Sequence, residues 1–112
     1  MTLTELARLH CQSRQGSPPL GSLQAQELLA LLPGWNLANG GRALQRRFDF
    51  PDFRCTLGFI NAVGYIANQQ DHHPDLQAAY GFCELIWTTH DTGGLSLNDF
   101  ICAARCQALI DG

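Results

Sequence analysis

Residues 71–90 read DHHPDLQAAYGFCELIWTTH, and this stretch decides the fold. From Leu76 to His90 the composition is typical of β-structure, but the run is too long for one average strand. Gly81 stands near its middle and is the residue best suited to a turn. The sequence therefore predicts two strands, residues 76–80 and 82–89, joined as an antiparallel hairpin.

A second hairpin is predicted upstream of this stretch. The run Asn39-Gly40-Gly41 favours a tight turn, because asparagine and glycine tolerate positive φ. A short strand over residues 35–37 leads into the turn, and a longer strand over residues 42–50 returns from it. Apolar residues alternate with polar ones along the longer strand, and Arg46 is the exception on the apolar face.

Helical spacing of apolar residues predicts three helices around these hairpins. The first covers residues 22–32 with Ser22 as its N-cap, the second residues 52–70, and the third residues 96–110, opened by the capping-box spacing of Ser96 and Asp99. This order of elements predicts an α+β fold: a four-stranded, largely antiparallel sheet with three helices packed on one face.

The first twenty residues give a weaker signal. A threonine near the start could begin a short helix through Leu9, but the run Gly16-Ser17-Pro18-Pro19 ends any helix. We expect residues 1–20 to form a flexible N-terminal arm and residues 21–112 to form a single folded domain.

Charge and hydropathy exclude some classes of function. The 112-residue chain has a formal net charge of −3 and contains no lysine, which argues against general nucleic-acid binding. No apolar run is long enough to span a membrane, and charged residues interrupt any signal peptide. We therefore expect a cytoplasmic protein that binds neither nucleic acid nor membrane.

The five cysteines fit the same compartment, since they form no C-x-x-C pair and free thiols suggest a reducing environment. Cys102 and Cys106 lie four residues apart on the last predicted helix. They are either half of a metal site or two small buried side chains, and the buried interpretation is favoured.

Three of the four histidines fall within residues 72–90. His72 and His73 precede the first strand of the predicted hairpin, and His90 ends the second, so all three should meet at one end of the sheet. Pro74 keeps His73 extended, which directs the two neighbouring rings to opposite sides. Imidazoles transfer protons at neutral pH, and this cluster indicates acid–base chemistry.

Several carboxylates are placed to orient these rings. Asp71, Asp75 and Asp91 flank the histidines in sequence. Asp99 has two interpretations, because it could simply cap the last helix or could also reach the histidine site. Three histidines could instead hold zinc, but no H-x-x-x-H spacing and no fixed acidic or cysteine partner supports this.

The combination of these segments resembles the pterin-4a-carbinolamine dehydratase family. The resemblance rests on the run from Asp71 to Asp75, on Thr88-Thr89-His90-Asp91, on Gly93-Gly94-Leu95-Ser96 and on Asp99. Leu32-Pro33-Gly34-Trp35 and Pro18-Pro19-Leu20 add support, and the resemblance covers about residues 17 to 110. A single H-H-P would be weak, but the joint pattern is specific.

The resemblance implies a fold, a reaction and a set of roles. Members of the family have an α+β fold and form dimers or tetramers. They are hydro-lyases that dehydrate 4a-hydroxytetrahydropterin to the quinonoid dihydropterin, which recycles the cofactor of aromatic amino acid hydroxylases such as phenylalanine hydroxylase. They need no metal and no organic cofactor. A partner hydroxylase is a further expectation.

The same resemblance assigns residues to the site. His72, His73 and His90 become the catalytic histidines, with His72 and His90 as the proton-transfer pair and His73 mainly a pterin-binding residue. The substrate-binding residues expected are Asn68, Asp71, Pro74, Thr89, Asp91, Thr92 and Asp99.

One position departs from the family's pattern. Members commonly carry an acidic residue four positions before the first histidine, and this chain has Asn68 there. An amide forms hydrogen bonds but supplies no negative charge, so a pterin contact or a charge partner is in doubt. This departure keeps open an alternative function, a non-catalytic assembly or coactivator-type protein on the same fold.

Overall fold

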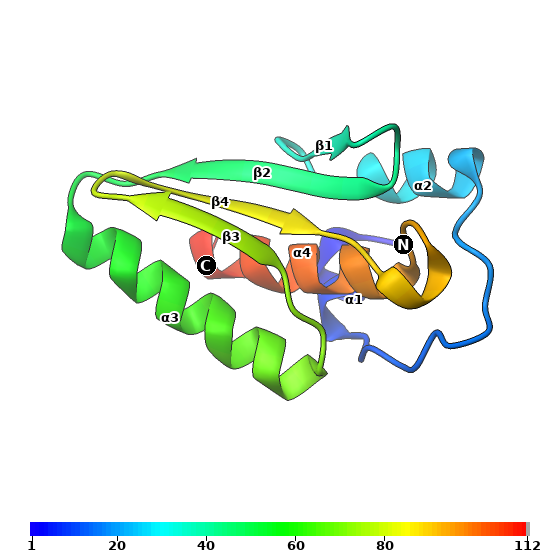
Figure 1. The fold of residues 1–112 in the computed structure, drawn as a ribbon. Coiled ribbons are helices and arrows are strands. Elements are labelled where there is room, and N and C mark those ends of the chain that lie inside the picture. Colours follow the sequence, from blue (N-terminus) through cyan, green and yellow to red (C-terminus); the bar gives the residue numbers. More distant parts are fainter. Residues whose placement is uncertain (112) are drawn as a thin grey trace.

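The computed structural model describes residues 1–111. Its elements, in chain order, are α1 (Leu3–Arg8), α2 (Ser22–Leu29), β1 (Asn36–Ala38), β2 (Ala43–Asp49), α3 (Phe53–Gln70), β3 (Asp75–Ala79), β4 (Phe82–Trp87), the 3₁₀ turn η1 (His90–Thr92) and α4 (Leu97–Asp111). The strands form one sheet in the order β1-β2-β4-β3, and all neighbours are antiparallel (Figure 1). The predicted α+β fold with a four-stranded antiparallel sheet is confirmed.

Both predicted hairpins are confirmed as well. Residues Asn39-Gly40-Gly41 all have positive φ, and the N–H of Gly41 donates to the carbonyl of Ala38 over 3.1 Å. The second turn follows Ala79, which pairs with Phe82 across β3 and β4. Because these strands are antiparallel, the chain that enters β3 and the chain that leaves β4 lie at the same end of the sheet.

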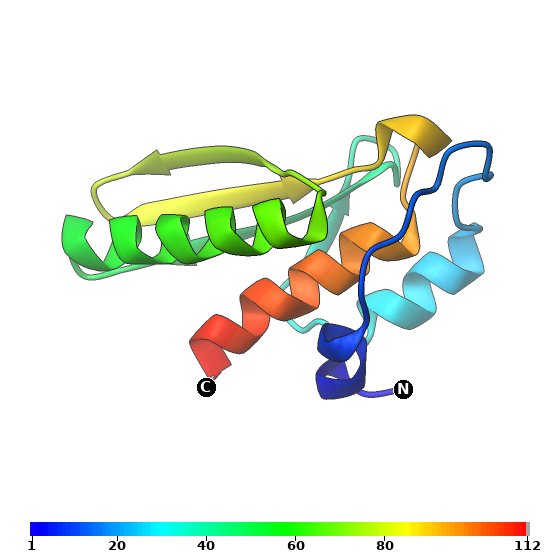
Figure 2. The same ribbon diagram turned by 90° about the horizontal axis from the view of Figure 1, so that it is seen from below.

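The core lies between the sheet and helices α3 and α4, which pack against the same face (Figures 1 and 2). Along β4 every second side chain is buried, namely Cys83, Leu85 and Trp87. The buried side chains of α3 recur at helical spacing, at Thr56, Phe59, Val63 and Ala67. The buried side chains of α3 and β4 therefore pack together in one apolar layer.

Arg46, the polar residue on the apolar face of β2, is accommodated by its neighbours. Its guanidinium lies over the ring of Phe48, 4.6 Å from the centroid. It also donates hydrogen bonds to the side chain of Gln107 and to the carbonyl of Pro33. The stem of the arginine thus covers apolar surface while its charged end stays hydrogen-bonded.

Two helix boundaries differ from the sequence-based expectation. Gly21, not Ser22, is the N-cap of α2, and the side chain of Gln24 accepts from the N–H of Gly21 over 3.3 Å. The regular helix also ends at Leu29, and residues 30–32 continue as tight turns. Helix ends fray into such turns, and side-chain periodicity does not locate them.

Residues 1–20, expected as a flexible arm, pack against the rest of the chain in this structure. The short helix α1 carries a capping box between Thr2 and Glu5 and lies along α4 (Figure 2). Leu6 is fully buried there. Beyond α1, Arg105 of α4 donates to the carbonyl of Leu9 over 2.6 Å. A six-residue helix with one buried residue is too short for the periodicity of apolar residues to reveal this packing.

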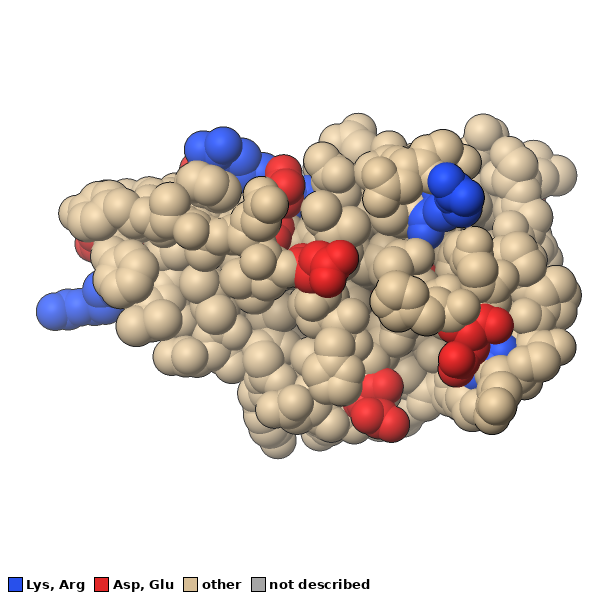
Figure 3. All heavy atoms as spheres, viewed as in Figure 1, with Lys and Arg blue, Asp and Glu red and all other residues tan. Residues whose placement is uncertain are grey.

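Two surface properties bear on function. No helix within residues 1–111 has both the length and the apolar character needed to cross a membrane. On the face drawn in Figure 3, arginines are few and separated, with acidic side chains between them. That face therefore lacks the continuous positive surface that nucleic-acid binding requires.

The packing of α1 can be tested with Leu6→Ala. Removal of a fully buried leucine side chain should lower the free energy of unfolding by about 3 kcal/mol. The control is Leu23→Ala, because Leu23 is 71% exposed on α2 and its loss should change stability by less than about 0.5 kcal/mol. Urea denaturation measures both. Equal, small effects would show that α1 does not belong to the folded core.

Candidate functional site

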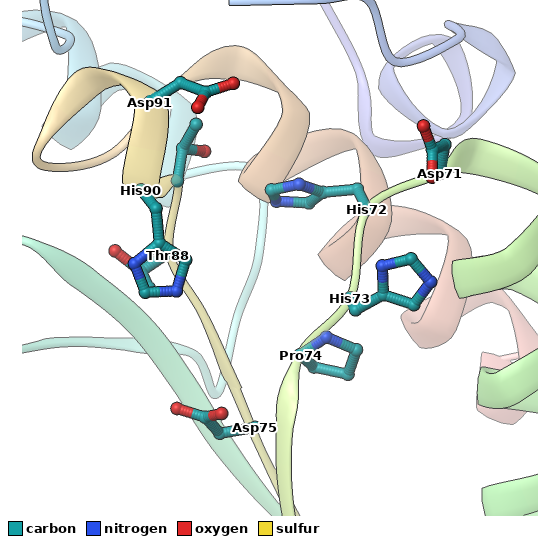
Figure 4. A pocket seen from close by; sticks show the side chains of 9 residues that line it. Asp71, His72, His73, Pro74, Asp75, Thr88, His90 and Asp91 are labelled. Carbon is teal, nitrogen blue, oxygen red and sulfur yellow. The ribbon is translucent and has the colours of Figure 1, made fainter.

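The three clustered histidines lie at the end of the sheet where the chain enters β3 and leaves β4. They line a cavity of about 370 Å³, a volume typical of small-molecule sites. The other residues that line it are Asp71, Pro74, Asp75, Thr88, Thr89 and Asp91. Figure 4 shows that these side chains come from two segments, the one that enters β3 and the one that follows β4. The convergence expected from an antiparallel hairpin is therefore observed.

The end of α3 directs the first of these segments into the site. Asp52 caps the other end of the helix, where its carboxylate accepts from the N–H of Cys55 over 2.9 Å. At its C-terminus Asp71 adopts a left-handed conformation, with φ of 51°, and the N–H of His72 bonds back to the carbonyl of Ala67. This left-handed residue ends the helix and turns the chain so that His72 leads into β3.

His72 is the most constrained of the histidines. Its Nε2 lies 2.6 Å from Oδ1 of Asp99, and its ring stacks on Trp87 with 5.6 Å between centroids. Its side chain is only 12% exposed. A carboxylate only accepts hydrogen bonds, so Nε2 carries a proton and donates it. In the neutral ring Nδ1 is then left as an acceptor.

Asp99 serves both as a helix cap and as a partner of the site. It is fully buried, and its second oxygen, Oδ2, accepts from the N–H of Ser96 and from the hydroxyl of Thr89, over 2.9 and 2.8 Å. Its first oxygen faces His72. Three donors thus satisfy one buried carboxylate. Asp99 both caps α4 and contacts His72.

His73 and His90 differ from His72 because both are exposed. Figure 4 shows the rings of His72 and His73 on different sides of the extended chain, as Pro74 and the strand geometry predict. His90 lies across the cavity at the start of η1. The site therefore combines one fixed imidazole with two imidazoles that solvent and ligand can reach.

Three of the expected substrate-binding residues lie elsewhere. Asn68 is exposed on the last turns of α3 and does not line the cavity. The hydroxyl of Thr92 shares its proton between the carbonyls of Gly94 and Thr89, 2.8 and 3.2 Å away, which stabilises the turn after β4. Asp99 lies beneath His72 and is closed to solvent. None of the three lines the cavity, and their contact with a ligand stays a prediction.

The N-terminal segment forms a further part of the site that the sequence did not indicate. A second cavity of about 270 Å³ adjoins the first and shares Asp71, His72, Thr89 and Asp91 with it. Its outer wall is residues 11–14. The side chain of Asn98 holds this wall, since Oδ1 accepts from the N–H of Gln12 and from Nε of Arg14, both over 3.1 Å. Amide-to-backbone contacts of this kind leave no periodic signal in a sequence.

The structure also bears on the two cysteines of the last helix and on the metal-site interpretation. Cys102 and Cys106 are both fully buried, as the buried interpretation expects, and burial raises the pKa of the Cys106 thiol to about 12. Within the described residues, no three side chains of the histidine, cysteine or carboxylate type are placed to hold a metal ion. The expectation of a metal-free site stays a prediction.

Comparisons with known proteins agree on one family. A family model described as "Pterin 4 alpha carbinolamine dehydratase" matches residues 18–109. A protein of Stenotrophomonas maltophilia (strain K279a), named "Putative pterin-4-alpha-carbinolamine dehydratase", is 48% identical over 97% of this chain and 95% of its own length. A protein of the same name from Xanthomonas oryzae pv. oryzae (strain PXO99A) is 50% identical over 97% of this chain and 93% of its own.

A solved structure shares the fold. The crystal structure of a transcriptional coactivator/pterin dehydratase from Brucella melitensis superposes with a TM-score of 0.78 at 31% sequence identity. It covers 81% of this chain and 97% of its own. With the family match over residues 18–109 and relatives that align along nearly the whole chain, the protein belongs to the pterin-4-alpha-carbinolamine dehydratase family.

Proposed function

We propose that this protein is a hydro-lyase that dehydrates 4a-hydroxytetrahydropterin to the quinonoid dihydropterin by histidine acid–base catalysis. The observation that carries the proposal is the fixed His72–Asp99 pair at the wall of a cavity that His73 and His90 also line. Family membership supports the pterin as ligand. In this role the protein would recycle the cofactor spent by aromatic amino acid hydroxylases, including phenylalanine hydroxylase.

The reaction needs two proton transfers. The C4a–O bond breaks and the departing oxygen takes a proton from a general acid, while N5 of the pterin loses its proton to a general base. His72 suits the base, because Asp99 accepts from Nε2–H, leaves Nδ1 free to accept, and stabilises the imidazolium that forms. Exposed His90, across the cavity, suits the acid, and His73 suits a binding role.

The further expectations form part of the same proposal. The reaction uses no metal and no organic cofactor, since imidazoles supply both proton transfers. A homodimer or homotetramer fits two exposed apolar features, the edge strand β3 with Leu76 and the outer face of α3 with Phe53, Leu57 and Tyr65. An aromatic amino acid hydroxylase is a candidate partner, and a cytoplasmic location fits the free thiols.

A second candidate function is a non-catalytic assembly or coactivator-type binding protein. The Brucella melitensis protein is called a transcriptional coactivator as well as a pterin dehydratase, which keeps this candidate open. The two candidates differ in one measurable property. Only the enzyme needs the histidine cluster for turnover of a hydroxypterin.

The first test of the proposal substitutes His72. A hydroxylase generates 4a-hydroxytetrahydropterin in situ, and its loss is followed spectroscopically. We expect the wild-type protein to accelerate the loss and His72→Ala to lower kcat/KM by about 100-fold or more. The matched control is His10→Ala, because His10 is exposed and lies outside the histidine cavity. No acceleration by micromolar wild-type protein would exclude the enzyme and leave the binding protein.

A second test separates orientation of the ring from its presence. In Asp99→Asn the amide oxygen can still accept from Ser96 and Thr89, which turns the NH₂ group toward His72. The ring must then accept at Nε2 and carry its proton on Nδ1, the wrong tautomer for a base that faces the cavity. We expect kcat to fall on the order of 10³-fold with little change in KM.

The control for this variant is Asp52→Asn, the same chemical change at the N-cap of α3. Asparagine caps a helix about as well as aspartate, so activity and stability should stay near those of the wild type. Circular dichroism should show that both variants are folded. Full activity in folded Asp99→Asn would contradict the assignment of His72 as the base.

A further inference from the structure

Two thiols that the proposed reaction does not use lie close together beside the site. Sγ of Cys11 is 3.6 Å from Sγ of Cys102, although the residues are 91 positions apart in the chain. Cys11 follows α1 in the N-terminal segment, and Cys102 lies on α4 within one turn of Asp99. A disulfide needs about 2.05 Å between its sulfurs, so a local approach of about 1.5 Å would complete a bond.

The backbone around Cys11 is already held in position for this approach. Its N–H donates to the side chain of Gln70 over 2.8 Å, and Asn98 binds the backbone of Gln12 through both its Oδ1 and its Nδ2. Figure 2 shows this N-terminal segment crossing next to α4. The two sulfurs are therefore held together by the fold and do not depend on a chance encounter.

The surroundings give the two thiols different roles. Cys11 is half-buried and lines the second cavity, so small solutes can reach it, whereas Cys102 is fully buried. A hydrogen bond from Cys102, together with the positive charges of Arg105 and Arg14 nearby, lowers the pKa of the Cys11 thiol. The same bond and burial raise the pKa of Cys102. Thiolate is the nucleophilic form, so Cys11 is the attacking sulfur and Cys102 the resolving one.

The other three cysteines lack these features. Cys55 is exposed, but the carboxylate of Asp52 raises the pKa of its thiol. Cys83 and Cys106 are buried, and burial raises their pKa values to about 11 and about 12. Reactivity toward an oxidant should therefore be confined to the Cys11–Cys102 pair.

We propose that Cys11 and Cys102 are an oxidation site at which hydrogen peroxide forms a disulfide, linking the N-terminal segment covalently to α4 beside the histidine site. Cys11 first loses its proton to water, and its thiolate then attacks one peroxide oxygen. The O–O bond breaks, and the released hydroxide takes up one proton, equivalent to the one that Cys11 lost, to give water. Cys11 is then a sulfenic acid.

The second step closes the disulfide. The sulfur of Cys102 attacks the sulfur of the sulfenic acid, the S–O bond breaks, and the hydroxide leaves as water with the proton of Cys102. Two thiols lose two electrons, and one peroxide becomes two waters. Dithiothreitol reverses the oxidation by thiol–disulfide exchange.

The link should change stability in a measurable way. It would join the segment that follows α1 to the last helix, α4, so the closed loop contains most of the chain and removes much freedom from the unfolded state. For a domain of this size the expected rise in Tm is about 10 °C or more. The rise should disappear when the disulfide is reduced.

The experiment treats the full-length protein with stoichiometric hydrogen peroxide and counts free thiols. We expect the number of free thiols to fall from five to three, with Cys11 and Cys102 recovered as one cross-linked peptide by mass spectrometry. Five unchanged thiols, a link through another cysteine, or Cys11 oxidised to the sulfinic acid without a link would each overturn the proposal.

Variants provide the controls. Cys11→Ser should abolish both the thiol loss and the rise in Tm, and Cys102→Ala should do the same. Because two different substitutions remove the same bond, a folding defect in one variant does not decide the result. Cys55→Ser is the matched control and should behave like the wild type. Because thiol counts and Tm are independent of pterin turnover, this proposal can fail or hold whatever the outcome for the proposed enzyme.

Discussion

The buried carboxylate of Asp99 joins three parts of this fold. It is fully closed to solvent and accepts from the start of α4 through Ser96, from the chain after β4 through Thr89, and from the chain before β3 through His72. A buried charge without such partners costs several kcal/mol, so the segments that supply the donors must lie where they do. The N-terminus of α4 adds a favourable dipole for the negative charge. The orientation of His72 is therefore fixed by the same contacts that begin the last helix.

The order of the strands explains why the histidines differ in exposure to solvent. β4 is an inner strand, so Trp87 and Thr89 at its end are buried and form a rigid support for His72. β3 is an edge strand whose residues are all exposed, which leaves His73 before it open to solvent. A single hairpin thus supplies both a fixed ring and accessible rings. This division suits a site in which one group must be oriented and others must meet a ligand.

The sequence predicted the features that depend on local or periodic signals. The turn at Gly81 and the antiparallel rule were enough to bring His72 and His90 to one end of the sheet. Asn68, which was expected to bind substrate, does not line the cavity, and the helix pattern itself could have indicated this. Ala67 belongs to the buried stripe of α3, and the next residue lies about 100° further around a helix of 3.6 residues per turn, so Asn68 falls outside that stripe and is exposed.

No local or periodic signal in the sequence predicted that residues 11–14 would form a wall of the site. It depends on one buried leucine in α1 and on the side chains of Gln70 and Asn98, which bond to backbone that is far away in sequence. The segment also precedes residue 18, where the match to the family begins. The histidine cluster and the wall beside it therefore come from separate parts of the chain. Changes within residues 11–14 could alter access to His72 or its surroundings, while Asp99, Thr89 and Trp87 keep the ring in the same orientation.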